Sequence, residues 1–197
     1  MLRKTYKFRI YPNKVQRELI ERHFGSVRWV YNWGLEKKIK TYQKDKKHIS
    51  CFDLINELVK LKRQEDCKWL NEVNSQSLQM ALRNLDNAFT NFFRRQNKFP
   101  QFKSRKNNKQ SFQIPQHYSI DSKLHIPKIP NIKIKLSRKI EGKIKTATIS
   151  KSATGKYHIS ILVEQNIELP PKPKVAEKTT IGVDFGVRTF ATISDGR

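Results

Sequence analysis

The stretch KTYKFRIYP, residues 4–12, decides the fold. Tyr6, Phe8 and Ile10 alternate with basic residues, which is the period of a strand with one buried face, and the proline then stops the strand. A sustained period of two returns only from residue 111 onward. We therefore expect the early strand to join those later strands in one sheet, and the residues between them to be an insertion.

The later strands occupy residues 111–164. IKIKL (132–136), IKTATIS (144–150) and KYHISILVE (156–164) each alternate apolar with polar residues, and SATG (152–155) has the composition of a turn. Short strands of this kind predict an antiparallel barrel or sandwich with one solvated, basic face. With the helices described next, the fold class is α+β.

The interval between the strands has helical periodicity. Asn13 can cap a first helix, which Gly25 is expected to end, and a second helical stretch covers residues 26–47. Two helices around a glycine resemble a helix-turn-helix, although two packed helices of a bundle show the same pattern.

Two more helices are expected after this pair. Ser50 and Asp53 have the spacing of a capping box and open one of them. The other, the longest expected helix, runs from Ser75 to about Gln96 with one apolar stripe that is typical of core packing. The stripe consists of Leu78, Leu82, Leu85, Phe89 and Phe92.

Charge is the dominant feature of the composition. Lys and Arg number 41 against 17 Asp and Glu, a net charge of +24, and such an excess attracts polyanions, nucleic acid first. An AT-rich genome would raise the lysine content but would not explain the few acids. A membrane-surface protein is the main alternative, and it would need a basic amphipathic helix with a clean apolar face.

The most basic segment, FFRRQNKFPQFKSRKNNKQSF (92–112), has neither helical nor strand periodicity. Cations bind phosphates and aromatic faces stack on bases, so this segment is the candidate nucleic-acid interface. The alternative is a solvated loop whose phenylalanines fill the edge of the core. The candidate binding residues are Arg94, Arg95, Lys98, Phe99, Phe102, Lys103, Arg105, Lys106 and Lys109.

Residues 166–178 form a stiff linker rich in Pro and Lys, and TTIGVDFGVRTFATISDGR (179–197) follows it. Asp184 lies in an expected strand between Gly182 and Gly186, and the small neighbours leave the space that a Mg²⁺ ion requires. Two-metal phosphodiester chemistry needs several carboxylates, and this stretch supplies one at such a position. The alternative is a structural Asp whose oxygens cap the following turn.

The start of the chain is charged and lacks the apolar region of a signal peptide. No run approaches the length of a transmembrane helix. Cys51 and Cys67 match no zinc spacing, and a disulfide framework is not expected. These features predict a reducing, cytoplasmic setting without membrane contact.

Five stretches, in this order, resemble the amino-terminal part of the TnpB (OrfB) proteins of bacterial insertion sequences. The Phe-Phe-Arg-Arg…Phe-Pro-x-Phe-Lys-Ser-Arg block is the most specific, and the likeness covers essentially the whole chain. The five stretches are KFRIYPNKVQRELI (7–20), RWVYNWGL (28–35), ALRNLDNAFTNFFRRQNKFPQFKSRKNNKQSF (81–112), IPKIPNIKIKLSRKIEGKIKTATISKSATGKYHISILVE (126–164) and IGVDFGVRTFATISDGR (181–197).

The resemblance implies an RNA-guided, Mg²⁺-dependent DNA endonuclease with guide RNA and double-stranded DNA as partners, at the nucleoid of a bacterium or archaeon. It also implies a wedge barrel that receives a helical insertion, followed by a RuvC nuclease domain of RNase H-like fold, whose first acid Asp184 matches. The implied division is 1–12 for the first wedge strand, 13–97 for the helical insertion, 98–165 for the basic loop and remaining barrel, 166–178 for the linker and 179–197 for the start of the nuclease domain.

The later Glu and Asp of the family and its Cys-rich zinc ribbon have no counterpart here. The resemblance therefore implies a truncated or decayed copy, or a fragment, with an incomplete Mg²⁺ site at Asp184, no stably bound metal and no cleavage by this chain alone. The alternative hypothesis is a stand-alone basic RNA- or DNA-binding module or repressor, in which Asp184 shapes a turn.

Overall fold

The structure is a computed structural model that describes residues 1–106, 110–168 and 180–194. The chain divides into two compact units, Met1–Asn166 and Ile167–Arg197. In the described part of the chain, no helix has both the length and the apolarity needed to cross a membrane. Lys109 and most of the expected linker lie outside the described residues.

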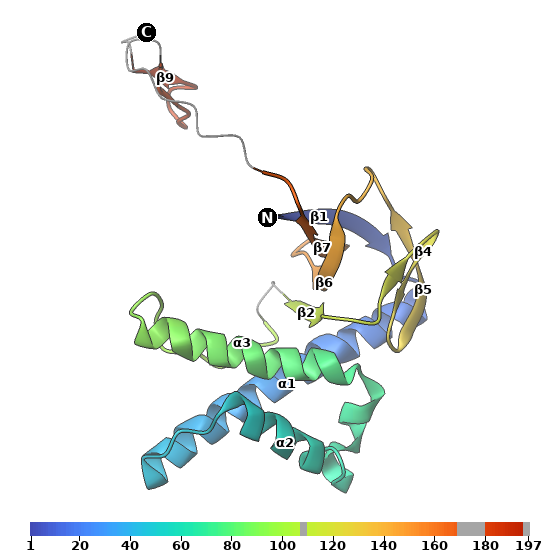
Figure 1. The fold of residues 1–197 in the computed structure, drawn as a ribbon, viewed down its shortest axis with the longest axis vertical. Coiled ribbons are helices and arrows are strands. Elements are labelled where there is room, and N and C mark those ends of the chain that lie inside the picture. Colours follow the sequence, from blue (N-terminus) through green and yellow to red (C-terminus); the bar gives the residue numbers. More distant parts are fainter. Residues whose placement is uncertain (107–109, 169–179, 195–197) are drawn as a thin grey trace. The chain divides into compact units, whose positions relative to one another are not determined.

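The first unit contains a curled antiparallel sheet, and β1 lies in its middle (Figure 1). β1 pairs with β7 on one side and with β5 on the other, which confirms that the first strand joins the later ones around an insertion. The sheet is an open half-barrel, with β2 and β3 at its edges, and the fold class is α+β as expected. In sequence, the strands are β1 (Leu2–Tyr11), β2 (Gln110–Ile114), β3 (Ser119–Ile120), β4 (Lys123–Ile126), β5 (Ile129–Lys135), β6 (Lys143–Lys151) and β7 (Tyr157–Gln165).

The core of the sheet follows from the alternation in β1 and β7. Tyr6 is opposite Ile161 and Phe8 is opposite Ile159 in the register, and all four side chains are buried. Residues directly opposite one another point to the same face of an antiparallel sheet. The alternate positions of both strands therefore form the other face, which carries the basic residues.

The insertion consists of α1 (Lys14–Asp45), α2 (Cys51–Leu61), a 3₁₀-helix η1 (Glu65–Glu72) and α3 (Ser75–Phe93). Both expected caps are confirmed. Asn13 and Gln16 form a capping box at α1, and Ser50 and Asp53 form one at α2. The leucines of the α3 stripe are buried, while its two phenylalanines are partly exposed.

The expected end of the first helix at Gly25 is wrong. Residues 14–45 form one helix of 32 residues, which makes α1 rather than α3 the longest. A glycine inside a helix costs only about 1 kcal/mol, and the buried Phe24 and Val27 on either side of Gly25 hold the helix against the core. The helix–glycine–helix pattern expected around Gly25 is therefore not formed, because α1 runs through it without a break.

The three helices meet at Gly34. A Cβ atom there would lie 2.7 Å from Leu82 Cδ2, 3.1 Å from Leu85 Cδ2 and 3.6 Å from Leu54 Cδ1. The first two atoms belong to α3 and the third to α2. The missing side chain thus sets how closely α1 approaches the other two helices.

His23 connects α1 to the start of α3. Its Nε2 accepts a hydrogen bond from the Asn74 N–H at 3.1 Å, so Nδ1 carries the proton and donates to the Leu19 carbonyl at 2.8 Å. The ring stacks on Phe112 of β2, with centroids 4.8 Å apart. Burial lowers the pKa of His23, and the neutral imidazole therefore joins two helices and the edge strand.

The two glycines of α1 make a matched pair for mutagenesis. Gly25→Ala should stabilise the fold by about 0.5–1 kcal/mol, because alanine is the better helix former and its Cβ would meet nothing within 4 Å. Gly34→Ala should destabilise the fold, because overpacking a core costs about 1–3 kcal/mol and outweighs that gain. Urea unfolding measures the stability of both variants. A Gly34→Ala protein as stable as the Gly25→Ala protein would contradict the close approach of α1 to the other two helices at Gly34.

Candidate nucleic-acid interface

The basic segment begins where α3 ends in a Schellman motif. The Arg95 N–H donates to the Phe92 carbonyl at 2.9 Å, and the Gln96 N–H donates to the Asn91 carbonyl at 2.9 Å. This motif places Arg95 at φ 58°, the left-handed region where glycine is usual. An arginine stands there instead, beside the helix C-terminus, whose dipole favours cations.

Phe99 anchors the segment to the end of α3. Its ring packs edge-on against Phe89 and Phe92, with centroids 5.5 and 5.3 Å apart, and still leaves 44% of the residue exposed. Phe102 is 57% exposed and has no ring contact among the described residues. Phe99 thus partly fills the edge of the core, as the alternative interpretation required, whereas Phe102 remains free to stack on a base.

Asn32 of α1 fixes the backbone of the segment. Its Oδ1 accepts from the Lys103 N–H at 2.8 Å, and its Nδ2 donates to the Lys103 carbonyl at 3.0 Å. The Lys103 ammonium lies 4.0 Å from the centroid of the Tyr31 ring, and its partial burial lowers the pKa of Lys103. Lys103 is therefore engaged in holding the segment on α1.

The other described cations of the segment have no acidic partner. No carboxylate of the described residues forms an ion pair with Arg94, Arg95, Lys98, Arg105 or Lys106, whereas several acids elsewhere are paired with Lys or Arg. Glu164, for example, contacts both Arg3 and Lys145. Five positive charges on a held backbone are thus free to meet phosphates.

A small cleft adjoins the segment and adds residues that the sequence did not single out. It has a volume of about 120 Å³ and is lined by Arg28 of α1, by Lys103 and Ser104, and by the start of β2. Arg28 and Asn32 are four residues apart, so both face the segment from one side of the helix. That spacing within the expected second helix was the available signal, and it becomes informative only once the segment is known to lie against this side of α1.

The solvated face of the sheet is basic, as the alternation predicted. Arg9 is opposite Lys135 in the register, and Lys7 is opposite Ser160. Burial and the neighbouring Lys7 and Arg9 cations lower the pKa of His158 on the same face. The Nε of Arg9 is buried and has no hydrogen-bond partner among the described residues.

In the second unit, Asp184 lies on a short hairpin of β8 (Val183–Asp184) and β9 (Thr192–Ile193). The strands are shorter than the expected Ile181–Phe185 and Phe190–Ile193. The Gly182 N–H donates to Ser194 Oγ at 2.9 Å, which ties the two strands together. The exposed Asp184 carboxylate has no hydrogen bond or ion pair within the described residues, so it does not cap the turn there.

Within the described part of the chain, Asp184 is not accompanied by a metal-binding cluster. The described residues contain no group of three His, Cys, Asp or Glu side chains that could hold a metal ion. The carboxylate is a hard oxygen ligand of the kind that Mg²⁺ prefers. It therefore fits as one ligand of a larger set.

Comparison with known proteins defines the class. A family model of the OrfB type, described as a helix-turn-helix domain, matches residues 1–47, which contain β1 and α1. The match and the fold define an insertion-sequence protein of the OrfB class. The chain belongs to the TnpB/OrfB family.

Three curated relatives support this assignment. A protein of Escherichia coli (strain K12), "Putative RNA-guided DNA endonuclease InsQ", is 33% identical over 195 residues, 98% of this chain and 47% of the relative. A Streptomyces pristinaespiralis protein with the same description, without the name InsQ, is 32% identical over 99% of this chain and 49% of its own length. The chain thus spans about half the length of these two. "Virulence protein VsdF" of Salmonella dublin is 38% identical over 112 residues, 52% of this chain and 93% of that protein.

The end of α3 offers a test of the left-handed arginine. Arg95→Gly should stabilise the fold by about 1 kcal/mol, because the left-handed conformation costs an L-residue about 1–2 kcal/mol. Arg94→Gly is the control, since Arg94 has φ −78° and glycine gains nothing there. The urea unfolding midpoints of the two variants are compared. An Arg95→Gly protein no more stable than the Arg94→Gly protein would show that the left-handed backbone at Arg95 is not strained.

Proposed function

We propose that this chain is the nucleic-acid-holding portion of a TnpB-type RNA-guided DNA endonuclease, and that it binds guide RNA and target DNA through their phosphates. The observation that carries the proposal is the stretch Arg94–Lys106, whose backbone is held by Asn32 and whose free cations have no described acidic partner. In such systems base pairing reads the sequence, while the protein holds the backbone. A fixed, unneutralised row of cations suits that task.

The net charge of +24 supports the same proposal. Self-repulsion of that size destabilises a compact chain, and a bound polyanion relieves it. The basic face of the sheet offers a second surface for the phosphates of the same nucleic acid.

We further propose that Asp184 is the first acid of a RuvC-type, RNase H-like nuclease site. Two observations support it: the carboxylate is exposed on its hairpin, and Val183, Phe185 and Phe190 beside it are exposed as well. A two-stranded hairpin is marginally stable by itself, and apolar side chains of this kind suit a larger sheet. Mg²⁺ held there would activate water for attack on a phosphodiester, with Asp184 as one ligand.

A second candidate is a stand-alone nucleic-acid-binding module or repressor. The Salmonella dublin relative favours it, because 93% of that protein is matched by about half of this chain. On this hypothesis the first unit has its full function without any nuclease chemistry.

A salt titration tests the binding proposal. If about six phosphates are neutralised, the logarithm of the association constant for duplex DNA should fall by about five per tenfold rise in salt. Replacing Arg94, Arg95 and Arg105 by Gln should lower that slope by between two and three. Lys68→Gln is the control, because Lys68 is already paired with Glu65, and a slope near zero for the unchanged protein would reject the proposal.

Asp184 is tested separately from binding. Asp184→Ala should leave nucleic-acid affinity unchanged, and the 197-residue chain should show no Mg²⁺-dependent cleavage, because one carboxylate cannot hold two dications. A chimera with the carboxyl-terminal half of the Escherichia coli relative and its guide RNA should cut DNA, and Asp184→Ala should abolish that cutting. Robust cleavage by the unmodified chain would contradict an incomplete site, because it would require further acids. Cleavage by the Asp184→Ala chimera would remove Asp184 from its assigned role.

A further inference from the structure

An aromatic groove lies between the C-terminal parts of α1 and α3. Its volume is about 450 Å³, within the range of ligand pockets. Tyr42 of α1 contributes one ring, and Phe89, Phe92, Phe93 and Phe99 contribute the others. Phe93 is 72% exposed, so much of its ring surface meets solvent.

The charged residues of the groove are all basic. Lys38 lies buried at its base, paired with Asp86 at 3.0 Å, while Lys47 and His48 line the groove. Neither Asp nor Glu is among the lining residues. A ligand that complements this surface has a flat apolar group that packs on the aromatic rings and a negative charge that pairs with Lys47.

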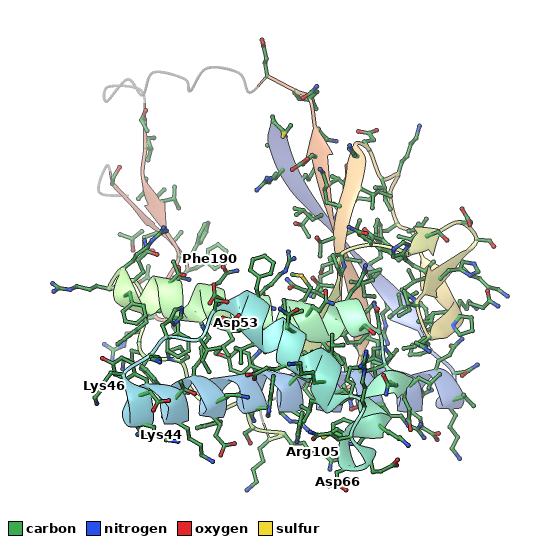
Figure 2. The ribbon with its side chains drawn as sticks, turned by 60° about the horizontal axis from the view of Figure 1, so that its bottom comes forward. Lys44, Lys46, Asp53, Asp66, Arg105 and Phe190 are labelled. Carbon is green, nitrogen blue, oxygen red and sulfur yellow. The ribbon has the colours of Figure 1, made fainter. Side chains whose placement is uncertain are left out.

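At the C-terminal ends of both helices beside the groove, a basic residue occupies the left-handed backbone conformation that usually belongs to glycine. Lys46 closes α1 at φ 55°, and Arg95 follows α3 at φ 58°. Lys46 precedes Lys47, which lines the groove, and Arg95 follows Arg94, the C-cap of α3. Gly or Asn would be less strained at both positions. Figure 2 shows Lys44 and Lys46 together at the end of α1. The two cations stand at helix C-termini, whose dipole favours positive charge, and they add to the basic character of this end of the insertion.

We propose that this groove binds one unpaired base of a single-stranded nucleic acid. The base stacks on Phe93, and the flanking phosphates meet Lys47 on one side and Arg95 on the other. This inference rests on the proposed nucleic-acid binding and adds a preference for an unpaired nucleotide. An apolar peptide would also meet the rings but would leave the cations without partners.

The test compares single-stranded and fully paired RNA of the same length in fluorescence anisotropy. Phe93→Ala should weaken binding of the single strand about tenfold, a value within the range for loss of one stacked base, and should leave duplex binding unchanged. Phe52→Ala is the matched control, because Phe52 is 74% exposed on α2 and does not line the groove. Phe93→Trp should retain single-strand affinity, because an aromatic face is restored.

A base analogue gives a second readout. The fluorescence of 2-aminopurine in the single strand should change on binding to the unchanged protein and to Phe93→Trp, but not to Phe93→Ala. Equal losses for single strand and duplex, or no loss for either, would overturn the groove assignment while the salt-dependent binding still stands. Absence of binding to any RNA or DNA by the unchanged protein would instead reject the proposed function.

Discussion

The hydrogen bonding of β1 along both of its edges is the constraint on which the rest of the structure depends. Nine consecutive residues, Leu2 to Ile10, pair with β7, and Arg9 to Tyr11 pair with β5. Because β1 is a central strand, the chain leaves the sheet after β1, and later strands return to pair with both of its edges, β5 on one side and β7 on the other. The helical insertion is thus attached to the sheet at both ends, and Gln16 reinforces the first junction by donating to the Pro130 carbonyl at 2.9 Å.

The candidate interface is a consequence of that attachment. The basic segment connects the end of α3 to the edge strand β2, and Asn32 fixes it to α1 on the way. Phe112 of β2 packs against His23 and Phe24 of α1, which secures the far side of the connection. The end of α3 and Asn32 hold the backbone of the described part of the segment at Arg95 and at Lys103, which reduces the ordering entropy that this part would lose on binding a ligand.

Several local features of the chain lower its stability. Arg95 occupies a left-handed position that glycine would fill more easily, and Arg9 keeps a buried Nε without a described partner. Few acids offset the cations of the chain. Departures from local rules of this kind concentrate at functional sites, where the folded structure compensates for them.

The sequence by itself determined what depends on neighbouring residues: the alternation at Tyr6, Phe8 and Ile10, the helix cap at Asn13, the capping box at Ser50, the turn at Gly155 and the family resemblance. Only the tertiary structure decided that α1 continues through Gly25, because buried contacts on both sides outweigh a local preference of about 1 kcal/mol. It also placed Lys103 on the Tyr31 ring and joined it to Asn32, 71 residues away in the chain. Such contacts depend on how α1 packs beside β2, and no periodicity within a single segment contains that information.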